Sequence, residues 1–104
     1  MNFQLSGAVL CAYDDIALGV IKHLTESGYK VPEDYSVIGM DNISVTEFVE
    51  PSLTTIDPYY EKICQSAWEL LKKKMKNKYY KSKEPIVYTA KLIKRDSVSK
   101  IKFK

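Results

Sequence analysis

Short apolar runs alternate with longer amphipathic stretches along most of this chain. Residues 7–13 and 35–40 have the length and composition expected of buried parallel strands. Between them, apolar positions recur at helical spacing over residues 16–24. Residues 53–56 form a third short apolar run. Strands that alternate with helices through short links predict an α/β fold, with a mainly parallel sheet and flanking helices.

The second half of the chain contains the clearest helical pattern, over residues 59–77. The apolar side chains of that pattern form one stripe: Ile63, Ala67, Trp68, Leu70, Leu71 and Met75. Residues 44–49 predict one or two helical turns, and residues 79–84 predict a lysine-rich loop. Residues 86–95 predict a last strand.

Acidic residues follow each of the three predicted strands. Asp14, Asp41 and Asp57 should therefore lie near the carboxyl edge of the sheet, where open α/β sheets bind ligands. Such carboxylates can hydrogen-bond a polar ligand, hold Mg²⁺, or serve the fold as helix caps and turn residues. A helix follows Asp14 and Asp15, so we favour caps there. No comparable helix follows Asp41, so we favour a ligand role for it.

Charge is distributed unevenly along the 104 residues, whose net charge is +3. Residues 1–71 hold three lysines and eleven acidic residues, whereas residues 72–104 hold thirteen basic and two acidic residues. Lysines suit the carboxyl end of a helix, so a solvated helix end is the favoured interpretation. A patch that binds phosphate groups or an acidic surface is the alternative.

Residue chemistry narrows the functional classes. Cys11 and Cys64 lie in apolar patterns and in no Cys-x-x-Cys pair, so we expect two buried thiols and a cytoplasmic, reducing location. A structural disulfide or a redox role is the alternative. His23 is the only histidine, and phosphate-binding glycine loops and nucleophile motifs are absent from the sequence. We therefore expect no enzyme, no catalytic residues, no cofactor and no metal. The apolar runs are shorter than the ~20 residues of a membrane helix, so no membrane partner is expected.

Four segments together resemble one protein family. They are residues 14–19 (DDIALG), 26–42 (ESGYKVPEDYSVIGMDN), 51–56 (PSLTTI) and 92–97 (LIKRDS). In this order they look like the C-terminal portion of a LacI/GalR (lactose/galactose repressor) family transcription regulator. The resemblance covers roughly residues 8–97. It implies one lobe of a periplasmic-binding-protein-like (type I) effector domain.

The resemblance also implies effector-binding residues. Members of the family bind sugars or purines between two lobes, and the position of Asp41 typically hydrogen-bonds the effector. Tyr13 stands where the family usually has a ligand-facing Asn, directly before Asp14, which we include in the expected site. Tyr60 corresponds to a ligand-facing aromatic of some members, with core or rim packing as the alternative.

The same resemblance implies a division into lobes. Residues 1–104 would form a single partial domain, with residues 8–57 and 86–97 in the C-terminal lobe. Residues 58–78 would form a helix of the N-terminal lobe. Operator DNA would then be bound only through a helix-turn-helix outside this sequence. We expect the apolar stripe of that helix to favour self-association.

The family dimerises through the first helix of this lobe and a nearby segment, which correspond to Leu18 and to Phe48 and Val49. Intrachain packing is the alternative for these residues. The leading functional prediction is thus the effector-binding and dimerisation portion of a bacterial transcription regulator. A sugar-binding transport component of the same fold is the first alternative. A receiver-like phosphorylation domain is the second, although its phosphoacceptor should end the third strand and Asp41 ends the second.

Overall fold

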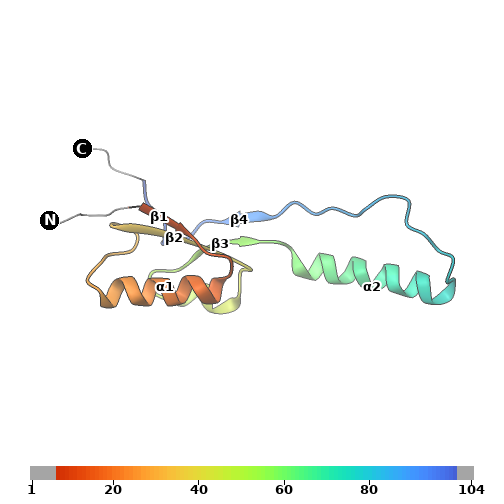
Figure 1. Cartoon of the computed structure of the whole chain (residues 1–104), viewed down its shortest axis with the longest axis horizontal. Helices are drawn as coiled ribbons and strands as arrows, with labels where there is room; N and C mark the ends of the chain where they lie inside the picture. The colour runs from red at the N-terminus through yellow and green to blue at the C-terminus, as the bar shows by residue number, and fades with distance from the viewer. Residues whose placement is uncertain (1–6, 101–104) are drawn as a thin grey trace. The chain divides into compact units, whose positions relative to one another are not determined.

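The computed structural model describes residues 7–100 and divides the chain into two compact units. Unit 1 contains Met1–Asp57 and Leu92–Lys104, of which residues 7–57 and 92–100 are described, and unit 2 is Pro58–Lys91. Figure 1 labels their elements. No helix in the described part of the chain is long and apolar enough to cross a membrane.

The sheet consists of β1 (Gly7–Leu10), β2 (Tyr35–Met40), β3 (Thr54–Asp57) and β4 (Lys91–Ile93). The strands lie side by side in the order β1-β2-β3-β4, and β2 pairs in parallel with both β1 and β3. This arrangement confirms the predicted α/β fold with a mainly parallel sheet. Because parallel strands end at one edge, it brings the segments that follow β1, β2 and β3 together.

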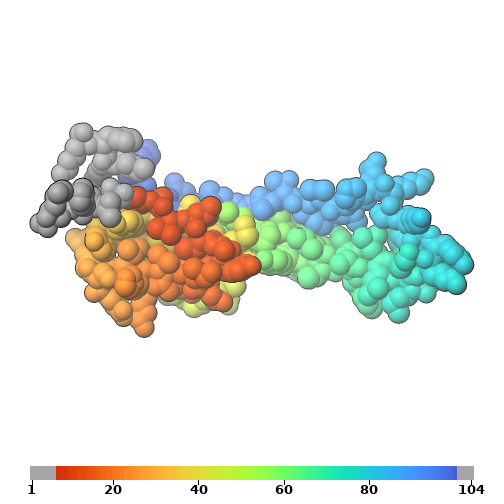
Figure 2. All heavy atoms as spheres, in the orientation of Figure 1, coloured from red at the N-terminus to blue at the C-terminus, as the bar shows by residue number. Residues whose placement is uncertain are grey.

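Helix α1 (Asp14–Glu26) connects β1 to β2 and packs against β2. The buried apolar core of unit 1 comprises Cys11, Ala17, Ile21, Val37 and Leu53. In Figure 2 the atoms of β1 and α1, red to orange, lie against one another. The core is small because the apolar face of one helix covers one short parallel sheet.

The beginning of α1 corrects one prediction. Tyr13, in an extended conformation, occupies the N-cap position, and no side chain makes a capping hydrogen bond there. Asp14 and Asp15 lie in the first helical turn, where their charge still complements the helix dipole. Asp14 makes no cap because its carboxylate is used elsewhere in unit 1, as described below.

The predicted helical turns at residues 44–49 are present as a 3-10 helix, η1 (Ser44–Glu47). The predicted last strand is shorter than expected, since only Lys91–Ile93 joins the sheet. Residues 86–90 are exposed, and residues that favour strands do not form one without a neighbouring strand to pair with.

Unit 2 contains helix α2 (Tyr60–Lys76) and the chain that follows it. None of the residues of α2 is buried, and the apolar stripe is largely solvent-exposed, with Trp68 at 53% and Met75 at 72%. Cys64 is also exposed, so the prediction of a second buried thiol is wrong. Helical spacing correctly located the stripe, but spacing alone does not determine what covers it.

Candidate functional site: the carboxyl edge of the sheet

Asp41 follows β2 directly and adopts a backbone conformation that is unusual for any residue except glycine. Its φ is +122°, and the next residue, Asn42, has a φ of +56°. The Asp41 backbone N–H donates to the Ile56 carbonyl at 2.9 Å, which ties this turn to β3. Positive φ costs of order 1–3 kcal/mol and persists only where surrounding contacts impose it.

The side chain of Asn42 supplies several of those contacts. Its amide Nδ2 donates to Asp57 Oδ2 at 3.1 Å, and its Oδ1 accepts from Arg95 Nη2 at 2.9 Å. The Asn42 backbone N–H also donates to Thr55 Oγ1 at 3.3 Å. Both ends of the amide are thus used within unit 1, and the residue fixes the turn that carries Asp41.

Asp14 lies inside unit 1 with no exposed surface. One carboxylate oxygen accepts from Thr55 Oγ1 at 2.6 Å, and the other accepts from the Ile43 backbone N–H at 2.9 Å. A carboxylate buried in this way is stabilised by the hydrogen bonds it accepts. Asp14 therefore joins the start of α1 to β3 and to the turn after β2.

Gly39 makes room for the Asp14 carboxylate. A Cβ atom at Gly39 would clash with Asp14 Oδ1 and would lie 3.2 Å from Asp14 Cα and 3.1 Å from Leu53 Cδ2. The Gly-Met-Asp sequence of residues 39–41 therefore has a packing reason for its glycine. The requirement is space, because the φ of Gly39 lies outside the left-handed region.

Arg95 connects this edge of the sheet to η1, a role that our reading of the sequence did not identify. Its Nη1 donates to Thr46 Oγ1 at 2.8 Å and to the Leu53 carbonyl at 2.9 Å, while Nη2 donates to Asn42. Only 13% of the side chain is exposed, and Glu47 Oε1 lies 3.9 Å from Nη2. The planar guanidinium reaches three segments at once, which a lysine ammonium could not do in the same geometry.

The segment after β4 is joined to β2 and β3 through Ser97. The buried Ser97 hydroxyl donates to the Val37 carbonyl at 2.6 Å and accepts from the Thr54 N–H at 2.8 Å. Ser52 Oγ also donates to Asp96 Oδ2 at 3.1 Å. Residues 51–56 and 92–97, which are separate motifs in the sequence, are thus joined by hydrogen bonds. The presence of both motifs is the feature of the sequence that indicates a structural role for Arg95.

The structure places the other expected effector residues as follows. Tyr13 lies between β1 and α1 in unit 1 and is more than half exposed. Tyr60 is the first residue of α2 in unit 2 and is about half exposed. Asp41 is half-buried at the end of β2. Within unit 1, Asp41, Asn42 and Asp14 are therefore brought together through β3, and Tyr13 precedes Asp14 directly.

The expected dimerisation residues differ in exposure. Leu18 and Val49 are half-buried against the core and border a hollow of about 440 Å³ beside α1. Phe48, the C-cap residue of η1, is 79% exposed. Intrachain packing therefore accounts for part of the apolar surface of Leu18 and Val49, whereas the Phe48 ring is exposed to solvent.

Burial also affects the chemistry of one thiol in unit 1. Burial raises the pKa of the Cys11 thiol above its ordinary value of 9.0, which makes the thiol less reactive at neutral pH. Within residues 7–100, no group of three or more His, Cys, Asp or Glu side chains could hold a metal ion. In this described part of the chain, the carboxylates of Asp14 and Asp57 accept hydrogen bonds from donors of the fold.

Comparison with known proteins identifies the fold. Residues 3–98 match the family described as the periplasmic binding protein-like domain. The chain belongs to this family. Over 94 residues it is 39% identical to the HTH-type transcriptional repressor PurR of Vibrio vulnificus and 43% identical to that of Mannheimia succiniciproducens. Each alignment covers 90% of this chain and 28% of the relative, so the chain spans little more than a quarter of their length.

Solved structures agree with this assignment. A LacI family transcriptional regulator from Enterococcus faecalis V583, with bound ribose, has a TM-score of 0.86 and 36% identity. A regulator of the same family from Enterococcus faecium, also with bound ribose, has a TM-score of 0.82 and 33% identity. They cover 93% and 91% of this chain, which covers 36% and 35% of theirs. The resemblance to LacI/GalR effector domains is thereby confirmed, and these relatives are transcriptional regulators rather than enzymes.

Proposed function

We propose that this chain supplies ligand-contacting residues of the effector domain of a bacterial transcription regulator. The effector is a small polar molecule, a sugar or a purine, and the regulator acts in the cytoplasm. Operator DNA is recognised by a helix-turn-helix of the kind that the relatives' names specify. The chain itself has a binding role and no catalytic one.

The observation that carries the proposal is the backbone of Asp41. A half-buried acidic residue with a φ of +122° lies at the carboxyl end of a central parallel strand. Asp57 and Arg95 hold the following residue, Asn42, in place through hydrogen bonds of 3.1 and 2.9 Å. Residues with a strained backbone that is held by surrounding contacts are concentrated at active sites and ligand-binding sites. The strain reduces the stability of the fold, and it is retained there because it positions a functional group. A carboxylate there accepts hydrogen bonds from hydroxyl or ring N–H groups.

The remaining effector residues take different roles in this proposal. Tyr13, exposed beside the first turn of α1, offers a ring and one hydroxyl to the ligand. Asp14 acts as a positioning residue, since its carboxylate is buried and accepts from Thr55 and Ile43. Tyr60 is a second aromatic contact, an assignment that the family resemblance carries.

We further propose that unit 1 contributes to a homodimer. The contact would include the exposed Phe48 ring and the hollow bordered by Leu18 and Val49. The hollow is lined mainly by apolar surface, and its lining also includes the charged residues Lys22 and Glu26. Such composition fits a protein partner with an apolar centre and a polar rim.

A thermal-shift screen tests the ligand assignment. Ribose, other simple sugars and purine bases are added to the chain over a range of concentrations, because a ligand of the folded state raises Tm as its concentration grows. We expect Asp41→Ala to remove the shift given by the active compound. Glu33→Ala is the matched control, since Glu33 is exposed just before β2, at the opposite end of that strand from Asp41.

A positioning variant sharpens the same screen. Arg95→Met removes the donors to Asn42 and Thr46 and should weaken binding at least about tenfold, the equivalent of one hydrogen bond to a charged group. Arg95→Lys should weaken ligand binding almost as much as Arg95→Met, because an ammonium group cannot reproduce the contacts of the guanidinium. An unchanged ligand shift in Asp41→Ala, with the compound still bound, would contradict the assignment of Asp41.

A further inference from the structure

The two units carry opposite net charges. Unit 2, residues 58–91, contains nine lysines and three acidic residues, a net charge of +6. The rest of the sequence has a net charge of −3. Mixed charges are typical of a surface that serves solubility alone. Strong segregation of charge instead creates a local field that attracts polyanions.

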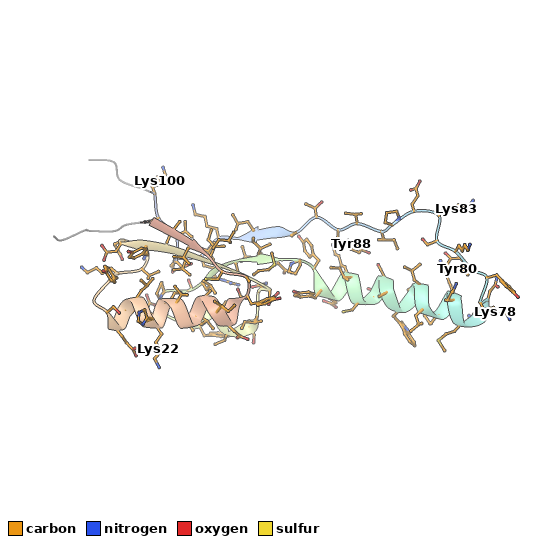
Figure 3. The ribbon with its side chains drawn as sticks, in the orientation of Figure 1. Lys22, Lys78, Tyr80, Lys83, Tyr88 and Lys100 are labelled. Carbon is orange, nitrogen blue, oxygen red and sulfur yellow. The ribbon has the colours of Figure 1, made fainter. Side chains whose placement is uncertain are left out.

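Most of the positive charge of unit 2 belongs to one cluster, which we call the basic tip. It consists of six exposed lysines in the last turn of α2 and the loop after it: Lys73, Lys74, Lys76, Lys78, Lys81 and Lys83. Figure 3 places Lys78, Tyr80 and Lys83 around the end of α2, where the chain reverses. In Figure 2 the same segment, in cyan, gathers at one end of unit 2.

Local contacts hold the loop of the basic tip on the helix. Lys74 Nζ donates to the Tyr80 carbonyl at 3.2 Å, and the Tyr80 N–H donates to the Asn77 carbonyl at 2.9 Å. The Lys73 and Lys78 ammonium groups lie over the rings of Tyr80 and Tyr79, 5.6 and 5.1 Å from the centroids. The cations are thus placed by a carbonyl and by aromatic rings, and these contacts leave their charge uncompensated.

Neither ion pairing nor the helix dipole accounts for this charge. Among the lysines of residues 72–83, all of which are described, Lys72 alone forms an ion pair, with Glu69 at 2.9 Å. The dipole provides about half a negative charge at the end of a helix. Lys78, Lys81 and Lys83 lie beyond the end of α2 at Lys76. Solvation of a helix end therefore explains only part of the cluster.

We propose that the basic tip binds the phosphate backbone of duplex DNA without reading its sequence. All nine basic residues of unit 2 are lysines, and Arg95, the only arginine of the chain, serves unit 1. Lysines are point charges that suit phosphates, whereas base recognition favours the bidentate arginine fork. The choice of DNA over an acidic protein rests on the proposed function, which places the chain in a regulator that works on DNA.

Fluorescence anisotropy with the whole chain and a labelled duplex of mixed sequence, about 20 bp long, tests the proposal. The logarithm of the binding constant should fall linearly with the logarithm of the salt concentration, by about 0.9 per phosphate neutralised. The triple variant K74Q/K76Q/K78Q should weaken binding at low salt at least about tenfold and reduce the slope by about 3. The variant K74R/K76R/K78R should retain the slope.

The matched control removes the same charge from unit 1. K30Q/K94Q/K100Q changes three exposed lysines of that unit and should leave the slope unchanged. Equal loss in both triple variants would overturn the basic tip as the binding surface. Displacement of the duplex by polyglutamate as effectively as by unlabelled DNA of equal charge would overturn DNA as the partner and indicate an acidic protein. Circular dichroism of each variant verifies that α2 is intact.

No effector is present in this experiment, so its outcome is separate from that of the ligand screen. Asp41→Ala should abolish the ligand shift and leave the salt slope unchanged. Loss of duplex binding in Asp41→Ala would contradict the proposal, because Asp41 belongs to unit 1 and adds negative rather than positive charge.

Discussion

The two units use apolar side chains differently. Unit 1 encloses a core of five buried apolar residues and holds its polar residues with hydrogen bonds between strands, turns and η1. In unit 2, α2 has an equally clear apolar stripe but none of its residues is buried. Figure 1 shows α1 against the sheet of unit 1, and the chain of unit 2 returning beside α2. The apolar residues of α1 and α2 thus have the same helical spacing, but only those of α1 include buried residues.

The difference indicates where stability and function lie. A helix in a protein gains most of its stability from packing of its apolar face against other elements. Unit 1 should therefore determine the cooperative unfolding of the chain. Unit 2, with its exposed stripe and its basic tip, has the features of a surface that binds other molecules.

The largest expected effect is a loss of stability that is confined to unit 1. Gly39→Ala places a methyl group against the Asp14 carboxylate and Leu53, so we expect a loss of about 3 kcal/mol in the free energy of unfolding. Urea unfolding followed through the amide signals of β2 measures it. The fluorescence of Trp68, the only tryptophan, reports on α2 separately.

Gly19→Ala is the matched control for this substitution. Gly19 lies within α1 and a Cβ there meets open space, so alanine should raise stability by about 0.5–1 kcal/mol. Equal stability of the two variants would show that the contact between Gly39 and Asp14 does not constrain the edge of the sheet.

A second, smaller effect concerns association through the stripe of α2. We expect the chain to self-associate at micromolar concentrations, because Ile63, Trp68, Leu71 and Met75 expose contiguous apolar surface. Trp68→Gln should weaken association at least about tenfold, as loss of a buried aromatic does at an interface. Analytical ultracentrifugation measures the change.

Phe48→Ser is the comparison variant from unit 1, since that side chain is even more exposed. A larger effect of Phe48→Ser than of Trp68→Gln would assign self-association to unit 1. A monomer at all concentrations in the unmodified chain would remove the expectation for both surfaces.

The smallest effect separates the two thiols. At pH 8 the exposed Cys64 should react with a disulfide reagent rapidly, while the buried Cys11 reacts slowly, because burial limits access and raises the pKa of its thiol. Because the pKa of the Cys11 thiol is higher in the folded than in the unfolded state, its contribution to the free energy of unfolding is fully present below the unfolded-state pKa. This contribution is lost as the pH rises through the folded-state pKa.

Cys11→Ser should therefore reduce the loss of stability of the chain above about pH 9, as measured by urea unfolding. Equal reaction rates of the two thiols in the native chain would contradict the difference in burial between the units.

The sequence alone indicated the fold class and the family with some detail. Alternation of apolar runs and helical stripes located three strands, α1 and α2 to within a few residues, because burial selects side chains at a period set by the backbone. The last strand was overestimated, since pairing with β3 depends on a partner that is distant along the chain.

At the carboxyl edge of the sheet, the sequence identified the acidic residues but not their roles. Asp14 and Asp41 follow similar strands, yet the first is buried against Thr55 and Ile43 and the second is held at positive φ. Asp14 is buried because its carboxylate accepts hydrogen bonds from donors that lie 29 and 41 residues further along the chain.

Arg95 illustrates the same limit. It was noticed as part of a motif, but its contacts with Asn42, Thr46 and Leu53 span 42 to 53 residues of sequence. Periodicity and composition determined which residues are apolar, acidic or basic. Tertiary structure decided which of them are satisfied internally, because hydrogen bonding and burial depend on neighbours that local sequence does not specify.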